Sequence, residues 1–380
     1  MTDLNRDSEI SPQIGQYEED INLTEEEREE LIEAEATAEA VTYSGQDFDV
    51  NGLVRRLSSD DILIPIFHHE DERIKSAGFQ RSFVWTKKQM DRFIESLLLG
   101  YPVPGIFLVR QSDRRYLVLD GQQRLRTLKF FYDGIYGGKE FALQNVADKF
   151  KGLTYKMLSD EQRRLLDDTF FQATIVAKND SDESLESIYQ IFERVNAGGT
   201  PLTPHEIRVA LFAGPFIDFL ENLNVNDQWR ELYGKKSPRL RDQELVLRII
   251  ALYQSQLTYR RPLKTFLNNF TFQHREMNGL NADKLSTRFI VACELIALTV
   301  GRSALRLQSN QPNAALTESI FVGLMHRLDD SRDINESSLS EAIIEIKNNP
   351  KLLSAVASAT ADEENVKMRL EVASVCLAEV

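Results

Sequence analysis

The sequence has little cysteine: only Cys293 and Cys376 occur among its 380 residues. Such a chain is not of the disulfide-rich kind that is common among secreted proteins, and its first residues contain neither a basic segment nor an apolar core typical of export. No apolar run reaches the roughly 18 residues that a membrane span needs, because Glu294 interrupts the longest candidate, 289–300. We therefore predict a cytoplasmic protein with reduced thiols and no membrane partner.

The motifs of two further protein classes are missing. No G-x-x-x-x-G-K-[ST] segment occurs, which excludes a P-loop nucleotide site. An HNH-type nuclease needs clustered histidine and asparagine groups, whereas His68 and His69 are adjacent and the other three histidines are scattered. We therefore predict no metal site made by protein side chains alone. DNA cleavage would then need a separate nuclease subunit.

The acidic excess is confined to one end of the chain. The net charge is −14, and residues 1–50 alone contain sixteen acidic and two basic residues, so the remainder is balanced. A capping-box pattern at 24–27 predicts a helix that continues to about residue 40. We predict that residues 1–45 form an acidic, partly disordered arm with one helix. The arm is either solvated or mimics nucleic acid and occupies a basic groove, and the sequence leaves both alternatives open.

The apolar pattern changes from strand-like to helical along the rest of the chain. Strands are predicted at 62–66, 106–109, 116–119 and 170–176, and Pro65 confines the first to a sheet edge. Helices are predicted at 87–99, with Thr86 as N-cap, and at 122–132. Further helices are predicted at 183–195, 204–212, 215–223, 241–256, 262–269, 283–300, 314–328, 336–347 and 364–378. This is an α+β fold, with a small α/β module at 46–182 followed by a mainly helical region at 183–380 packed on it.

Three polar segments interrupt the apolar pattern. Asp120-Gly121-Gln122-Gln123-Arg124 follows a short apolar strand and opens a helix, which brings backbone N–H groups and an arginine to one turn. The second segment is Gln80-Arg81, and the third is Asn196-Ala197-Gly198-Gly199, a glycine-rich turn between two helices. Taken singly, a turn, a surface pair and a helix C-cap would explain them. Their occurrence in one chain favours a nucleotide site.

Three longer blocks contain these segments: FQRSFVWTKKQMDRFIESLLLGYPVPGIFL, YLVLDGQQRLRTL and IFERVNAGGTPLTPHEIRVAL. In this order, over residues 79–211, they resemble the GmrSD restriction endonuclease N-terminal domain family. That family belongs to the ParB/sulfiredoxin-like superfamily and is widespread in bacterial anti-phage systems. Residues 67–78 depart from its pattern, because they separate Gln80-Arg81 from the strand that usually precedes it closely. The resemblance implies a ParB-like module that binds and hydrolyses a nucleoside triphosphate at Gln80, Arg81, Asp120, Gly121, Gln122, Gln123, Arg124, Asn196, Gly198 and Gly199.

General chemistry suggests how these residues would act. Hydrolysis of a triphosphate depends mostly on positioning and on neutralisation of charge. Gly121 lets the backbone approach phosphate, and Arg124 neutralises it. Gln80 or Gln123 would orient the attacking water, and Asp120 would hold Mg²⁺ or act as base, so a nucleoside triphosphate and Mg²⁺ are the expected cofactors. Sulfiredoxin-type chemistry is excluded, because residues 1–292 contain no cysteine.

A basic loop follows the aromatic residues Trp229 and Tyr233 in the helical region. This composition is typical of a nucleic-acid contact, and we predict that DNA binds at Lys235, Lys236, Arg239 and Arg241. Three functions stay open. The chain is an NTP-hydrolysing component of a restriction or anti-phage system that gates DNA engagement or a partner nuclease, a non-hydrolysing nucleotide- and DNA-binding switch, or a weak DNA nickase that uses the same cleft. The last helix either packs in the core or forms a homo-oligomer contact.

Overall fold

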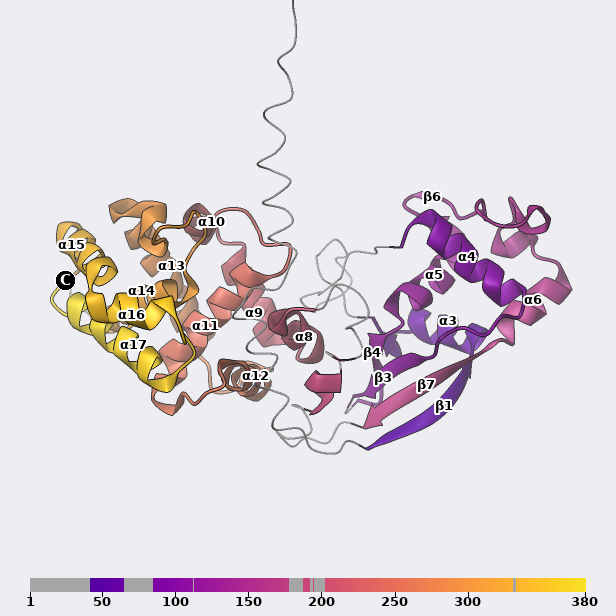
Figure 1. Cartoon of the computed structure of the whole chain (residues 1–380), viewed down its shortest axis with the longest axis horizontal. Helices are drawn as coiled ribbons and strands as arrows, with labels where there is room; N and C mark the ends of the chain where they lie inside the picture. Colours follow the sequence, from indigo (N-terminus) through magenta and orange to yellow (C-terminus); the bar gives the residue numbers. More distant parts are fainter. Residues whose placement is uncertain are drawn as a thin grey trace, which may run out of the picture. The chain divides into compact units, whose positions relative to one another are not determined.

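The computed structural model describes residues 42–64, 85–111, 113–177, 187–191, 194, 202–330 and 333–380 (Figure 1). The chain divides into two compact units. We call the described residues up to Leu202 the N-terminal unit and the residues from Thr203 onward the C-terminal unit. None of the described helices is both long and apolar enough to cross a membrane.

A mixed sheet forms the centre of the N-terminal unit. Its strands are β1 (Tyr43–Asp49), β2 (Ile62–Leu63), β3 (Ile106–Arg110), β4 (Tyr116–Asp120) and β7 (Phe170–Ala177), in the order β1-β7-β3-β4-β2. The pairs β1/β7 and β3/β4 are antiparallel, whereas β7/β3 and β4/β2 are parallel. The predicted edge strand at 62–66 is confirmed as the edge strand β2 over its described residues. Two short strands, β5 (Ile135–Tyr136) and β6 (Lys139–Glu140), form a separate hairpin.

Helices with one apolar face pack beside this sheet (Figure 1). They are α3 (Val50–Ser58), α4 (Lys87–Leu98), α5 (Gln122–Asp133) and α6 (Asp160–Asp167), with the short 3₁₀ helices η2 (Asp148–Phe150) and η3 (Tyr155–Met157). Thr86 begins α4 with a capping box, in which its hydroxyl and the Gln89 side chain each bond the other residue's backbone. The predicted N-cap is thus confirmed. Helix α5 ends at Asp133, one residue later than predicted, and the left-handed Gly134 is its C-cap.

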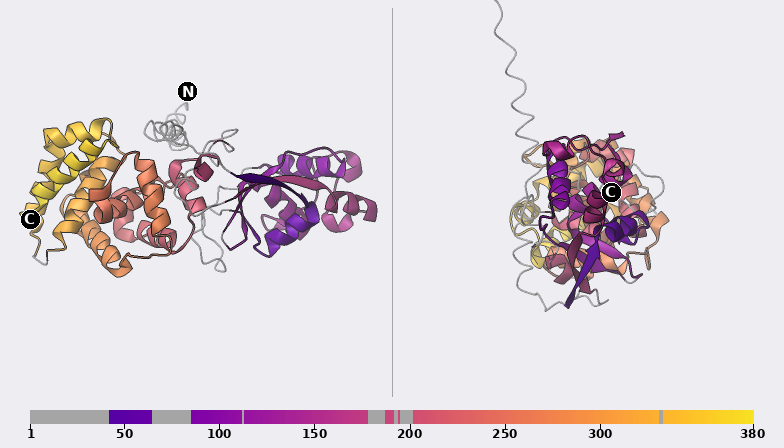
Figure 2. Two further views of the ribbon diagram at one scale, coloured as in Figure 1. Left: turned by 90° about the horizontal axis from the view of Figure 1, so that it is seen from below. Right: turned by 90° about the vertical axis from the view of Figure 1, so that its right-hand side faces the viewer.

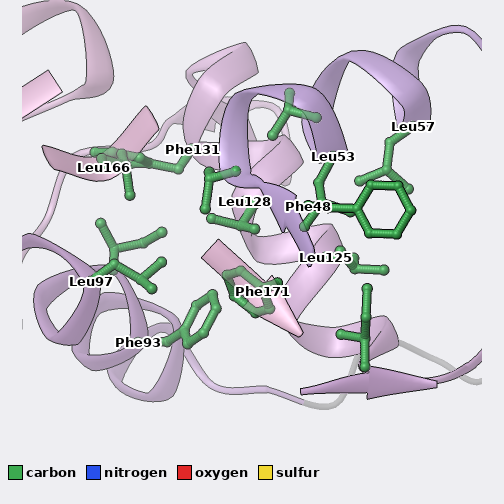
Figure 3. Close-up of a cluster of buried hydrophobic side chains, with 14 of the residues drawn as sticks. Phe48, Leu53, Leu57, Phe93, Leu97, Leu125, Leu128, Phe131, Leu166 and Phe171 are labelled. Carbon is green, nitrogen blue, oxygen red and sulfur yellow. The ribbon is translucent and has the colours of Figure 1, made fainter. Parts of the chain in front are cut away.

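One hydrophobic core joins these elements (Figure 3). Phe93 of α4 meets Phe171 of β7 edge to face, with ring centroids 6.3 Å apart. The labelled residues in Figure 3 come from β1, β7 and all four helices. Successive strand residues point to opposite faces, and both Leu108 and Val109 are buried, so the sheet is covered on both sides.

The C-terminal unit is helical over its described residues (Figure 2). Its helices are α8 (Pro204–Leu211), α9 (Pro215–Asn224), α10 (Asp227–Tyr233), α11 (Arg241–Ser255), α12 (Leu263–Gln273), α13 (Ala282–Thr299), α14 (Ala314–Arg327), α15 (Glu336–Asn348), α16 (Pro350–Ala357) and α17 (Glu363–Leu377), with the 3₁₀ helices η5 (Gln256–Thr258) and η6 (Gly301–Leu305). Helices α11 and α14 pack against each other and are buried almost all round. A helix that is buried on every side lies at the centre of its unit.

The α+β fold class is confirmed, because a small sheet near the start is followed by a mainly helical region. Sequence analysis missed β1, α3, α6, α10 and α16 and the short β5/β6 hairpin. The strand β1 has one buried residue, Phe48, so its apolar alternation is weak, and α10 and α16 span only seven and eight residues. The predicted helix at 24–40 lies outside the described residues. Of the predicted helix at 183–195, residues 187–191 and 194 are described and helical.

The last helix packs inside its own unit. Its apolar stripe, formed by Val366, Leu370, Ala373 and Leu377, is buried, and α17 contacts α14, α15 and α16. The stripe is therefore part of the core of this unit, as one of the two alternatives predicted, and a homo-oligomer contact elsewhere on the protein stays a prediction.

A buried charge cluster links α11, α14 and α17. The Glu318 carboxylate is fully buried and accepts a hydrogen bond from Arg248 Nε at 2.8 Å. It also pairs with Arg369, which is fully buried and donates to the Thr360 carbonyl. Two arginines thus share one buried carboxylate as a counter-charge. Removing one member of such a group leaves an uncompensated buried charge, which is strongly destabilising.

We predict that Glu318→Gln lowers the free energy of unfolding by about 3 kcal/mol or more, because Arg248 and Arg369 lose their shared counter-charge. Urea denaturation followed by circular dichroism measures the effect. The control is Glu276→Ala, which removes an exposed carboxylate 3.9 Å from Arg275 and should change stability by less than about 0.5 kcal/mol. Equal effects of the two substitutions would contradict the role of the buried cluster.

Candidate functional site

The junction between β4 and α5 is a single-residue turn. Asp120 ends the strand, Gly121 has a left-handed backbone with φ of 98°, and Gln122 begins the helix. The first intrahelical bond runs from Leu125 N–H to the Gly121 carbonyl at 2.9 Å. Gly121 supplies no side-chain cap to the helix start. Because the first N–H groups of a helix lack intrahelical acceptors, this end of α5 favours an anionic ligand.

Glycine is required at position 121 for two reasons. A residue with a side chain is strained at this φ. A Cβ built on Gly121 would also lie 2.5 Å from Ile106 Cγ2 of the neighbouring strand β3 and 3.4 Å from Arg124 Nη2. The turn is therefore packed closely against β3, and its backbone approaches the site without a side chain in between.

Asp120 and Arg124 form an ion pair across the first turn of α5. Arg124 Nη2 lies 2.5 Å from Asp120 Oδ2, and Arg124 Nη1 donates to the Pro104 carbonyl at 2.7 Å. The Arg124 side chain is only 11% exposed. These two bonds orient the planar guanidinium, while its remaining N–H groups donate to none of the described residues. A guanidinium held in this way can still grip phosphate oxygens.

These groups open into a cavity of about 340 Å³. Its described lining consists of Trp85, Phe93, Pro104, Leu119, Asp120, Gly121, Gln122, Gln123, Arg124 and Leu202. Trp85 and Phe93 meet edge to face at 5.4 Å and form an apolar wall. The Gln123 side chain accepts the Trp85 backbone N–H at 3.4 Å, which joins the polar segment to this wall. A cavity of this size with a few convergent polar groups is typical of small-molecule sites.

The structure brings together the predicted residues of the first segment, Asp120, Gly121, Gln122, Gln123 and Arg124, at this one cavity. The predicted residues Gln80, Arg81, Asn196, Gly198 and Gly199 lie outside the described residues. Trp85 and Leu202, which follow those two segments closely in sequence, line the same cavity. Sequence analysis did not select these two residues or Phe93 and Pro104 for the site, since apolar residues beside a motif give the same signal as core residues.

The basic loop of the C-terminal unit differs from the predicted arrangement. Lys235 and Lys236 are exposed, and Lys236 pairs with Glu221 at 2.7 Å. Arg239 is buried and pairs with Glu206 at 2.9 Å, and Arg241 is half-buried. The predicted DNA contact therefore keeps exposed cations only in its first half.

The two aromatic residues of that prediction differ in exposure, because Tyr233 is half-buried whereas Trp229 is enclosed. Trp229 is fully buried, and its ring contacts Tyr233, Phe289 and Phe321. A ring enclosed in this way cannot stack on a base. The indole N–H also has an internal acceptor, Asn224 Oδ1 at 3.1 Å.

The third block continues into a buried polar network around α8. Thr203 and Glu206 form a capping box at the start of this helix. Arg208 Nη1 lies 3.1 Å from His205 Nδ1, and His205 Nε2 lies 3.0 Å from Gln243 Oε1. Because arginine can only donate, Nδ1 must accept and Nε2–H donates to Gln243. Burial, reinforced by the Arg208 charge, holds the pKa of His205 well below its ordinary value.

Comparison with known protein families defines the class of this domain. Residues 63–213 match the family described as the GmrSD restriction endonuclease, N-terminal domain. The resemblance inferred from the three sequence blocks is thereby confirmed over these residues, which cover less than half of the chain. The matched range includes all the described residues that line the cavity. No curated protein and no solved structure matches the chain.

We predict that Gly121→Ala destabilises the protein more than Gly134→Ala does. Both glycines flank α5 with a left-handed backbone, but a Cβ at Gly134 has no atom within 4 Å. Gly134→Ala should thus cost about 1–2 kcal/mol from strain alone, and Gly121→Ala about 1–3 kcal/mol more from the contact with Ile106. Urea denaturation measures both, and equal losses would show that the turn is not packed against β3.

We also predict that stability falls as the pH drops below about 6.5, the ordinary pKa of histidine. The folded protein holds His205 neutral because its pKa is lowered, so below this pH the unfolded state binds a proton that the folded state does not. The free energy of unfolding should then fall by up to about 1.4 kcal/mol per pH unit from this group. Above about pH 8 the group contributes almost no pH dependence, because His205 is then neutral in both the folded and the unfolded state.

The matched variant for this measurement is His205→Gln, which cannot titrate. Its denaturation midpoints between about pH 5 and 7 should depend less on pH than those of the wild type. His326, whose pKa is also lowered by burial, accounts for a residual slope in both proteins. Identical slopes in wild type and variant would contradict a neutral, buried His205.

Proposed function

We propose that the chain is a component of a bacterial restriction or anti-phage defence system and that its N-terminal unit binds and hydrolyses a nucleoside triphosphate. The match of residues 63–213 to a restriction-endonuclease domain supports the first part of this proposal. The second part has its own support in the cavity at the β4–α5 junction.

The observation that carries the proposal is the convergence of Asp120, Gly121 and Arg124 on one cavity. The uncapped start of α5 and the Arg124 guanidinium both favour phosphate, and they come within one helical turn of each other. Because Gly121 has no side chain and a Cβ would not fit there, the backbone at the start of α5 stays accessible to a ligand. The residues present therefore fit the phosphates of a nucleotide.

Each residue has a role in hydrolysis. Arg124 neutralises the charge that the phosphates carry, and Gln123 or Gln80 orients the attacking water. Asp120 is the acidic residue in the described lining of the cavity. It would share Mg²⁺ with the phosphates or act as base, because Mg²⁺ in nucleotide sites is held by one or two carboxylates and phosphate oxygens. The apolar wall of Trp85 and Phe93 excludes water from one side.

Nucleotide turnover would gate DNA engagement or a partner nuclease, with cleavage carried out by a separate subunit. The exposed Lys235 and Lys236 support a DNA contact in the C-terminal unit, although Lys236 is partly neutralised by Glu221. A cytoplasmic setting, where nucleotide and DNA are both present, is part of this proposal.

We predict that phosphate release from one of ATP, GTP, CTP or UTP with Mg²⁺ depends on Arg124. Arg124→Ala should reduce turnover by about 100-fold or more, since it removes the main positive charge of the site. Malachite-green detection of phosphate, with and without DNA, measures turnover and names the nucleotide.

The matched control is Lys129→Ala. Lys129 belongs to the same helix and makes a pair of the same i,i+4 spacing with Asp133, 3.2 Å away, but it does not line the cavity. This variant should keep wild-type turnover. No release from any nucleotide by the wild type would contradict hydrolysis, and nucleotide binding without release would favour the switch instead.

A further inference from the structure

A second hollow, of about 490 Å³, lies on the N-terminal unit between α4 and the segment 145–147. Its lining includes Lys88, Arg92 and Tyr101 on one side and Asn145 and Ala147 on the other. None of its lining residues belongs to the cavity at the β4–α5 junction. We call this hollow the α4 groove.

Both walls of the α4 groove are fixed by buried or short polar contacts. Asp91, which is fully buried, accepts the backbone N–H groups of Gln144 and Asn145 at 3.1 and 3.0 Å and the Asn145 side-chain amide at 2.8 Å. Glu95 accepts the Ala147 N–H at 2.7 Å. The groove is thus held open in advance, which lowers the cost of binding a ligand there.

The side chains of the two cations of the groove have no partners among the described residues. Lys88 and Arg92 are exposed and lie one turn apart on α4, and their side chains make no hydrogen bond, ion pair or ring contact with the described residues. Their neighbour Lys87 differs, because it pairs with Asp91, donates to the Ala142 carbonyl and lies over the Phe141 ring. These contacts give Lys87 a structural role, whereas no contact of the Lys88 and Arg92 side chains with the described residues gives them one.

The position of Lys88 is unfavourable for the helix itself. The first turn of α4 contains no acidic residue, and a cation at the positive end of the helix dipole is destabilising. Within the part of the chain that the structure describes, Lys88 has no ion pair that would offset this cost. An anionic ligand in the groove would remove the conflict by neutralising Lys88.

Tyr101 adds an aromatic surface to the charged one. It is 58% exposed, and its ring contacts no other aromatic ring among the described residues. Lys88 and Arg92 are separated along the helix axis by about 6 Å, so both cations face the same groove. Paired cations beside an accessible aromatic ring are the features that bind single-stranded nucleic acid.

We propose that the α4 groove binds a strand of nucleic acid, with backbone phosphates against Lys88 and Arg92 and one base stacked on Tyr101. This inference rests on the restriction-system role proposed above for its choice of DNA as the ligand. It does not depend on nucleotide hydrolysis, because the groove and the cavity share no residue.

The test is fluorescence anisotropy of the full chain with a short labelled single-stranded DNA, without nucleotide, between about 50 and 200 mM salt. For the Lys88→Gln/Arg92→Gln variant, the slope of log affinity against log salt should become shallower by about 1.4, the loss of two phosphate contacts. Tyr101→Ala should weaken binding by about fivefold or more through lost stacking, whereas Tyr101→Phe should bind as the wild type does.

The charge-matched control is Arg55→Gln/Arg110→Gln, which removes two exposed cations outside the groove whose side chains pair with none of the described residues. This variant should keep the wild-type slope. An unchanged slope in the groove variant, or displacement of DNA by polyglutamate together with no effect of Tyr101→Ala, would overturn the proposal. Phosphate release measured on the same preparations separates the outcomes. If the groove variant keeps normal turnover and loses DNA binding, the groove proposal is supported. If it keeps both normal turnover and normal DNA binding, the groove proposal is refuted and the proposed hydrolysis is not.

Discussion

The left-handed turn at Gly121 fixes the geometry on which the candidate site depends. Its α-carbon lies so close to Ile106 that a Cβ would come within 2.5 Å of a methyl group of β3. One turn later, Arg124 reaches back to Asp120 and to the Pro104 carbonyl. The end of β4, the start of α5 and the segment before β3 are therefore tied to one another by a single close approach and two hydrogen bonds. The rigidity of the site therefore comes from close packing of the Gly121 backbone against β3, supplemented by the two hydrogen bonds of Arg124.

Helix α4 connects the two hollows of the N-terminal unit. Phe93 lines the cavity and Arg92 lines the α4 groove. The preceding residue, Asp91, accepts a hydrogen bond from Asn145 and so anchors the opposite wall of the groove. Successive residues of a helix point about 100° apart, so one helix serves both sites without sharing a residue. A small shift of α4 on its core would thus be felt in both places. If the cavity binds nucleotide and the groove binds DNA as proposed, α4 is the element through which the two ligands would influence each other.

The parts that could be predicted from the sequence are those whose cause is local. The turn at Gly121, the capping box at Thr86 and most helices of the C-terminal unit follow from residues within one or two turns of each other. The missed parts have distant causes. Leu202 lines the cavity more than 75 residues after Arg124 in the chain, and no pattern beside Leu202 indicates this. The network of α8 takes its partners Gln243 and Asn268 from helices 38 and 60 residues away.

Basic residues gave the least reliable signal, and the reason is their partners. In the C-terminal unit the arginines Arg208, Arg230, Arg239 and Arg248 are held by Glu244, Asp242, Glu206 and Glu318. A cluster of such residues in the sequence thus reflects the ion pairs of a helical core. Lys88 and Arg92 form no cluster that the sequence would single out, yet both are exposed and unpartnered among the described residues. A binding surface for nucleic acid needs charge that the protein leaves uncompensated, and that property becomes visible only once the partners of each cation are known.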